Sequence, residues 1–113
     1  MHEMSLMESV IEIACDVARR NGASEIREIR LRVGMLSHVD ARALSFCHEA
    51  VRHGTIAANA RLSIDHVPGR GWCLDCGKAV ALTERFGACP DCGRHRVQMT
   101  AGDELSIQDL EVI

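Results

Sequence analysis

Four of the six cysteines form two matched pairs, and this pattern is the strongest chemical signal in the sequence. Two residues separate Cys73 from Cys76 and Cys89 from Cys92, and twelve residues separate the two pairs. A two-residue gap lets both thiolates of a tight turn face one ion, and the glycine after each pair suits a turn with positive φ. Four thiolates favour tetrahedral zinc and leave no vacancy for a substrate. The spacing therefore predicts a structural zinc site.

Zinc is also expected to stabilise the segment that holds these cysteines. Few aliphatic residues surround them, so metal binding would supply the folding energy, about 10–16 kcal/mol for such sites. Redox chemistry is the weaker alternative, because redox-active thiols usually occur as a single Cys-x2-Cys motif, whereas this chain has two. Cys15 and Cys47 fall on apolar faces of expected helices and should be buried, inert thiols. A catalytic thiol would instead need a histidine nearby in space, such as His38 or His48.

The first three residues, Met1, His2 and Glu3, could chelate a second metal. The α-amine, the backbone nitrogen of residue 2 and the imidazole of His2 can hold one ion in small chelate rings. Ni(II) and Cu(II) accept such square-planar nitrogen sets. The amide nitrogen or the carboxylate of Glu3 could complete the set. The site requires Met1 to keep a free amine, and the bulky His2 should protect it from removal. A solvated histidine is the ordinary alternative.

The remaining histidines carry weaker signals. His66 and His95 flank the four-cysteine segment and are expected to face solvent, although each could reach a metal. His38, His48 and His53 fall on loop or polar helix positions and are expected at the surface. The sequence assigns none of the five a role.

Composition narrows the class of protein. The chain has 113 residues, 47% of them hydrophobic and only 3% aromatic, which predicts one aliphatic core with a small appendage. A net charge of −3 and few aromatics argue against nucleic-acid binding, and the cysteine segment with its zinc would be near neutral. No apolar run is long enough for membrane insertion and no signal peptide is visible, so a cytoplasmic protein is expected.

Composition and motifs leave more than one class of function possible. A zinc-ribbon nucleic-acid-binding or transcription accessory protein is the main alternative to a metal carrier. An enzyme is not expected and no catalytic residue is assigned, because the zinc site is closed. A glycine-rich phosphate loop and a nucleophile–base motif are also missing from the sequence.

Hydrophobic periodicity predicts the elements that must position these groups. They are a helix from Ser5 to a stop at Asn21-Gly22, a strand over Glu28 to Met35, a helix that Asp40 caps and Gly54 ends, a strand around Leu62 to Ile64, and a C-terminal strand. Ala50 is expected on the buried face of the second helix. In the last strand Leu105 and Ile107 share one phase and Leu110 and Val112 the other, so a bulge is expected near Gln108-Asp109.

The change in composition also predicts the domain organisation. Residues 69–97 hold four cysteines and several glycines but few aliphatics, unlike the flanking chain. We expect a discontinuous α/β-type domain, residues 1–68 and 98–113, with the cysteine segment 69–97 inserted as a zinc domain. The fold class is therefore α+β, a small sheet with two helices and an inserted zinc-ribbon-like domain.

Several short motifs occur together in one known family. Beside the Met-His-Glu start and the two Cys-x2-Cys-Gly turns, they are Ser5-Leu6, Leu31-x-Val33-Gly34-x-Leu36-Ser37-x-Val39, Ala43-Leu44-x-Phe46, Gly54-Thr55, and Gly102-x-Glu104-Leu105 leading to Leu110-Glu111-Val112. With these motifs, and along nearly its whole length, the chain resembles the HypA/HybF nickel metallochaperones of hydrogenase maturation.

The resemblance implies a function as well as a fold. It implies nickel binding at Met1, His2 and Glu3, and zinc binding at the four paired cysteines. Family members pass nickel, with a HypB-type GTPase as partner, to the large subunit of [NiFe] hydrogenase, and some also serve urease. The client enzyme stays open. A homodimer is compatible with the sequence, but nothing in it demands one.

Overall fold

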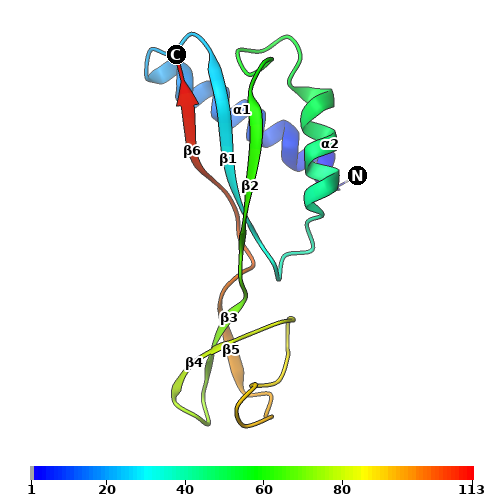
Figure 1. Cartoon of the computed structure of the whole chain (residues 1–113), viewed down its shortest axis with the longest axis vertical. Coiled ribbons are helices and arrows are strands. Elements are labelled where there is room, and N and C mark those ends of the chain that lie inside the picture. Colours follow the sequence, from blue (N-terminus) through cyan, green and yellow to red (C-terminus); the bar gives the residue numbers. More distant parts are fainter. Residues whose placement is uncertain (1) are drawn as a thin grey trace. The chain divides into compact units, whose positions relative to one another are not determined.

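The computed structural model describes residues 2–113, so Met1 lies outside the described residues. Two three-stranded sheets are present, with strand orders β2-β1-β6 and β4-β3-β5. In chain order the elements are α1 (His2–Arg20), β1 (Ile26–Gly34), α2 (Ala41–Val51), β2 (Arg61–Val67), β3 (Arg70–Cys73), β4 (Lys78–Ala81), β5 (Val97–Ala101) and β6 (Leu105–Val112) (Figure 1). The mixed α+β class with two helices and small sheets is confirmed.

The first helix, α1, begins at His2, three residues earlier than the expected start at Ser5. Its helical-period apolar stripe is buried, with the members Met7, Val10, Ile11, Ala14, Cys15 and Ala18. The helix ends as expected, because the Asn21 side chain donates to the Val17 carbonyl and Gly22 has φ 76°. In Figure 1, α1 passes behind the strands and meets α2.

The central strand β1 and its neighbour β6 change side-chain phase together. Ile29, Leu31 and Val33 are buried at period two, but the next buried residue toward the start of β1, Ile26, lies three positions away. The burial pattern of β6 shifts in the same way between Gln108 and Asp109, as the sequence predicts. The matched shifts keep one face of the sheet apolar along its whole length.

The second helix, α2, is capped as predicted. The Asp40 side chain accepts hydrogen bonds from the backbone N–H groups of Arg42 and Ala43. Two expectations about this helix are wrong. His48 is only 2% exposed, because it lies one helical turn after buried Leu44 and shares its face. Ala50, expected on the buried face, is exposed instead.

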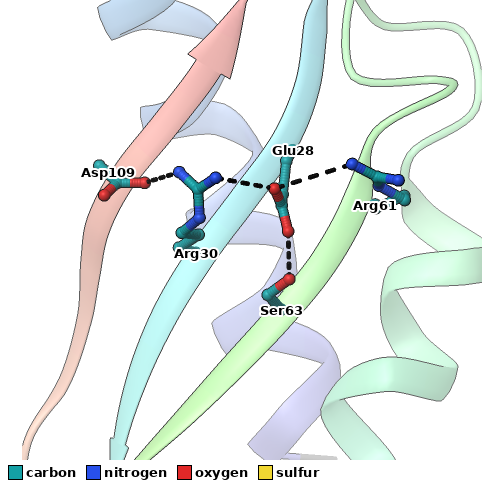
Figure 2. Close-up of polar contacts among 5 residues, drawn as sticks. All are labelled: Glu28, Arg30, Arg61, Ser63 and Asp109. Carbon is teal, nitrogen blue, oxygen red and sulfur yellow. Dashed lines mark hydrogen bonds and ion pairs between the residues drawn. The ribbon is translucent and has the colours of Figure 1, made fainter.

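The uncovered side of the β2-β1-β6 sheet carries a polar network (Figure 2). Glu28 lies at its centre and accepts hydrogen bonds from Arg30, at 3.0 Å, and from the Ser63 hydroxyl. Arg30 also donates to Asp109 at 2.5 Å, while Arg61 lies 3.9 Å from Glu28. The Ser63 hydrogen bond, with help from the two arginines, holds the pKa of Glu28 below its ordinary value. The network links all three strands.

The chain forms two compact units. One holds Met1–Leu31, Val39–Asp65 and Ser106–Ile113, and the other holds Arg32–His38 and His66–Leu105. The sequence-based boundaries at residues 68/69 and 97/98 stay a prediction. Among residues 2–113, neither helix is both long and apolar enough to cross a membrane.

The second unit contains the β4-β3-β5 sheet, which sequence reasoning did not predict. Cys73 in β3 pairs with Lys78 in β4 and with Val97 in β5. Its small core consists of Cys73, Cys89 and Val80, with Val97 packed against it. These strands have only four or five residues, too few for alternation to reveal them.

Candidate metal centres

The two cysteine pairs converge on one point in the second unit. One sulfur from each of Cys73, Cys76, Cys89 and Cys92 lies within 4.8 Å of all the others. The Sγ atoms of Cys73 and Cys92 are 3.7 Å apart, and those of Cys76 and Cys89 are 4.0 Å apart. Within residues 2–113 this is the one cluster of three or more histidine, cysteine or acidic side chains spaced to hold a metal.

Two equivalent turns bring the cysteines together. The Gly77 N–H donates to the Cys73 carbonyl, and the Gly93 N–H donates to the Cys89 carbonyl, each at 2.8 Å. Both glycines have positive φ, 65° at Gly77 and 75° at Gly93, as the sequence predicts. An L side chain would strain either turn, so the glycines fix the direction of each thiol pair.

Hydrogen bonds to sulfur favour the thiolate at Cys89 and disfavour it at Cys76. The Cys76 N–H donates to the Cys73 sulfur and the Asp91 N–H donates to the Cys89 sulfur, at 3.3 and 3.4 Å. Backbone hydrogen bonding, first from Cys92, lowers the pKa of Cys89 to about 7. Hydrogen bonding to Cys73 instead raises the pKa of Cys76 to about 12. Four adjacent thiols cannot all lose their protons unless a cation replaces them.

The distances fit a tetrahedral zinc ion. Zinc–sulfur bonds of about 2.3 Å place adjacent sulfurs of a regular tetrahedron about 3.8 Å apart. The Cys73–Cys92 and Cys76–Cys89 separations of 3.7 and 4.0 Å lie on either side of that value. An all-sulfur set of this shape suits zinc or iron and excludes hard cations such as magnesium. Because protein donors fill every corner, the site can stabilise structure but cannot bind a substrate.

Ion pairs connect the two turns to their surroundings. Asp75, between the first two cysteines, accepts a hydrogen bond from Arg96 at 2.9 Å. Asp91, between the second two, pairs with Lys78 at 2.6 Å. These pairs are partly exposed, so each contributes little to stability. They do neutralise charges next to the cluster.

The N-terminal end of α1 holds a second group of donor atoms. His2 Nδ1 lies 3.7 Å from a carboxylate oxygen of Glu3, and the same oxygen accepts a hydrogen bond from the Asp40 backbone N–H at 3.3 Å. That hydrogen bond, more than any other contact, lowers the pKa of Glu3. The His2 side chain is 63% exposed, whereas that of Glu3 is 15% exposed. The carboxylate is therefore fixed while the imidazole is accessible.

The contact with Asp40 is a feature that sequence reasoning missed. Asp40 was expected only as a helix cap, a role that it does fill through its side chain. Its backbone N–H reaches across 37 positions of the chain to Glu3. No periodicity or motif reports such a contact, because it depends on how α1 and α2 pack.

The other candidates stay outside both groups. His66 and His95 are exposed and do not join the four-cysteine cluster. Cys15 and Cys47 are 3% and 0% exposed, so the expectation that they are buried is confirmed. His48 Nε2 is buried and accepts or donates no hydrogen bond within the described residues. Burial, reinforced by Arg52, lowers the pKa of His48.

Comparisons with known proteins match this chain to one family over nearly its full length. The family model described as "Hydrogenase/urease nickel incorporation, metallochaperone, hypA" matches residues 1–112. The chain is 72% identical to a hydrogenase maturation factor HypA of Rhizobium leguminosarum bv. viciae, with 100% of both chains covered. It is 44% identical to a protein of the same name from Azotobacter vinelandii, with 99% of each covered.

Solved structures of HypA proteins have a similar fold. The solution structure of the Ni metallochaperone HypA from Helicobacter pylori superposes with a TM-score of 0.73 at 25% identity, covering 98% of this chain and 97% of that one. A second solution structure, of a HypA protein, gives a TM-score of 0.74 at 27% identity, with 100% and 97% covered. A matched family model, close relatives and a shared fold show that this chain belongs to the HypA family of nickel-incorporation metallochaperones.

Proposed function

We propose that this protein binds one Ni(II) ion at its N-terminus and delivers it to a nickel enzyme. The ligands would come from Met1, His2 and Glu3: the α-amine, backbone nitrogen and the His2 imidazole. Nitrogen donors of this kind form the square-planar sets that Ni(II) accepts. Nickel is the cargo in this scheme, so the protein acts by binding and release and carries out no catalytic turnover.

The observation that carries the proposal is the hydrogen bond from the Asp40 N–H to the Glu3 carboxylate, beside His2. It anchors one donor residue at the start of α1 and lowers its pKa, so the carboxylate stays ionised near a cation. His2, by contrast, is exposed. An anchored anion next to an accessible imidazole supports both capture of the ion and its release to an acceptor.

We further propose zinc as the resident metal of Cys73, Cys76, Cys89 and Cys92. When bound, zinc would supply the folding energy that the small core of this unit lacks. The residues of the unit orient and stabilise the ligands. The positive-φ glycines fix the direction of the thiols, and backbone N–H groups stabilise the thiolates. The second unit would then be a permanently loaded platform rather than a reactive site.

Delivery would require other proteins. The relatives are named hydrogenase maturation factors, and the family description includes hydrogenase and urease. We therefore propose the large subunit of [NiFe] hydrogenase as the acceptor, with urease as a second client. Among the described residues we find no nucleotide-binding loop, so any GTP hydrolysis would come from a partner GTPase of the HypB type.

A Ni(II) titration of zinc-loaded, untagged protein tests the nickel site. We expect one nickel per chain and a square-planar absorption band for the native protein, and loss of both in His2→Ala. His53→Ala is the matched control, because His53 is an exposed histidine away from the N-terminus and should leave binding unchanged. Equal binding by all three proteins, or by none, would overturn the proposal.

The same proteins separate this function from the nucleic-acid alternative. If the chain were a zinc-ribbon nucleic-acid-binding protein, its function would survive His2→Ala, and it would bind DNA or RNA in a salt-sensitive manner. We expect no such binding, and a strong salt-sensitive complex without nickel uptake would favour the alternative.

A further inference from the structure

The four sulfurs of the cysteine cluster differ in their access to solvent. Cys73 and Cys89, the first residue of each pair, are 0% and 1% exposed and belong to the small core of the second unit. Cys76 and Cys92, the second residue of each pair, are exposed. Each turn therefore presents one thiol to small molecules in solution and keeps the other one covered.

Each exposed sulfur lies against a buried sulfur of the opposite turn. The Sγ atoms of Cys92 and Cys73 are 3.7 Å apart, and those of Cys76 and Cys89 are 4.0 Å apart. A disulfide bond is about 2.05 Å long, so each of these contacts has to close by no more than about 2 Å. Backbone N–H groups of Cys76 and Asp91 hold the two buried sulfurs in place. The exposed sulfurs are therefore the ones that have to move.

We propose that Cys76 and Cys92 are oxidation sites for hydrogen peroxide, and that each then forms a disulfide with the buried cysteine that it contacts. Four protein ligands leave no vacancy on a bound ion, so the peroxide has to attack sulfur. Among thiolates, the accessible ones are oxidised first, which selects Cys76 and Cys92. The loss of zinc in this scheme rests on the proposed zinc site, whereas the disulfide pairing does not.

The chemistry takes two steps at each pair. The Cys92 thiolate attacks one oxygen of hydrogen peroxide, the O–O bond breaks, and with one proton the products are a sulfenic acid and water. The Cys73 thiolate then attacks the sulfenic sulfur, and with a second proton another water leaves as the S–S bond forms. Two electrons pass from the two sulfurs to one peroxide. Cys76 and Cys89 consume a second peroxide in the same way.

The two disulfides would replace the metal as the link between the turns. With all four sulfurs in disulfides, no thiolate is left to bind the ion, so zinc leaves. The covalent bonds then join the turn between β3 and β4 to the turn before β5. While reductant is in excess the unit stays loaded with zinc, and a dithiol restores the four thiols by exchange.

Trypsin makes the pairing readable, because Lys78 and Arg85 lie between the two cysteine pairs. Cleavage places Cys73 and Cys76 in the peptide of residues 71–78, and Cys89 and Cys92 in that of residues 86–94. Zinc-loaded, full-length protein is treated with a small excess of hydrogen peroxide, alkylated at its remaining thiols, digested and analysed by mass spectrometry. A disulfide across the turns links the two peptides, whereas a disulfide within a turn leaves them separate.

We expect release of one zinc, loss of four of the six thiols, and linked peptides in which fragmentation joins Cys73 to Cys92 and Cys76 to Cys89. Disulfides within each Cys-x2-Cys pair would overturn the proposal. So would oxidation to sulfinic acid without any disulfide, or a cluster that keeps its thiols and its zinc.

The other two cysteines are internal controls. Cys15 and Cys47 are 3% and 0% exposed and lie outside the cluster, so they should stay reduced and be alkylated only after unfolding. Cys15→Ala should lose zinc at the same dose of peroxide as the native protein. Elemental analysis before oxidation separates this inference from the zinc proposal. Protein that starts without zinc and still gives the linked peptides would contradict the metal assignment and support the pairing.

Discussion

The backbone N–H of Asp40 donates a hydrogen bond to the carboxylate of Glu3, 37 positions earlier in the chain. Asp40 is also the N-cap of α2, and its side chain accepts from the N–H of Arg42. Asp40 thus begins α2 and also holds the side chain of Glu3, the residue after His2. The partial positive charge at the start of α2 adds to the stabilisation of an anion there. The N-terminal donor group therefore depends on a helix far away in sequence.

Loss of the Asp40 side chain should cost stability through the cap. We expect Asp40→Ala to lower the free energy of unfolding by about 1 kcal/mol, because two N–H groups at the start of α2 lose their acceptor. Asp40→Ser keeps an acceptor and should cost only a few tenths of a kcal/mol. Urea denaturation of both variants measures the difference. Equal stability of the serine and alanine variants would show that the cap contributes nothing.

Removal of one ligand should unfold the second unit selectively. We expect Cys76→Ser to lose zinc to a chelator that leaves the native protein loaded, because three thiolates bind much more weakly than four. The matched control is Cys15→Ala, which removes a buried thiol outside the cluster and should keep one zinc per chain.

Two measurements check this prediction on zinc. Elemental analysis after dialysis against the chelator gives the zinc content of each variant, and amide NMR spectra report on the strands β3, β4 and β5. We expect Cys76→Ser to lose the dispersed signals of these strands while those of α1 persist. Full zinc retention by Cys76→Ser would contradict the assignment of the cluster.

Sequence patterns predicted the elements that repeat regularly and missed those that depend on packing. The apolar stripe of α1 and the phase change in β6 are periodic over many residues, so both were visible before the structure. The paired cysteines with their glycines were equally legible, because a tight turn needs fixed spacing. Their convergence on one point was predicted from that spacing and is confirmed.

The features that the sequence did not predict correctly have physical reasons. His48 was expected at the surface because it was assigned to a polar position of its helix, yet it shares the apolar face of Leu44. The strands β3, β4 and β5 have too few residues for alternation to show. The Glu3–Asp40 hydrogen bond joins two elements whose packing no local pattern encodes. Local rules thus locate donors along the chain, whereas tertiary packing decides which of them are anchored.

Burial of His48 should make stability fall in acid. Its pKa is lowered in the folded protein, first by burial and then by Arg52, so the unfolded chain binds the proton more readily. The stabilisation is fully present above the unfolded value of about 6.5. It is lost as the pH falls from there toward the folded pKa, at up to about 1.4 kcal/mol per pH unit.

Denaturation on both sides of this range tests the role of His48. We expect the loss of unfolding free energy between about pH 7.5 and 5.5 to be smaller in His48→Gln than in the native protein. His53→Gln is the control, because it removes an exposed histidine and should retain the native pH dependence. Identical pH profiles for the native protein and His48→Gln would rule out a contribution from this side chain.

Close backbone contact at Gly34 predicts a large stability effect of a single methyl group. A Cβ atom added at Gly34 would lie 2.1 Å from the carbonyl oxygen of Gly102. Neither segment can easily move away, since the Gly34 N–H donates to the Glu104 carbonyl and the Leu36 N–H to that of Gly102. We expect Gly34→Ala to cost more than about 3 kcal/mol, at the severe end for a single substitution.

Gly22 supplies the comparison for this substitution. It has φ 76° but nothing within 4 Å of an added Cβ, so Gly22→Ala should cost only the backbone strain, about 1–2 kcal/mol. Urea denaturation of both variants separates collision from strain. Gly34→Ala could be no less stable than Gly22→Ala only if the segments around Gly34 and Gly102 can move apart. That outcome would show that their close approach does not hold the end of β1 against the start of β6.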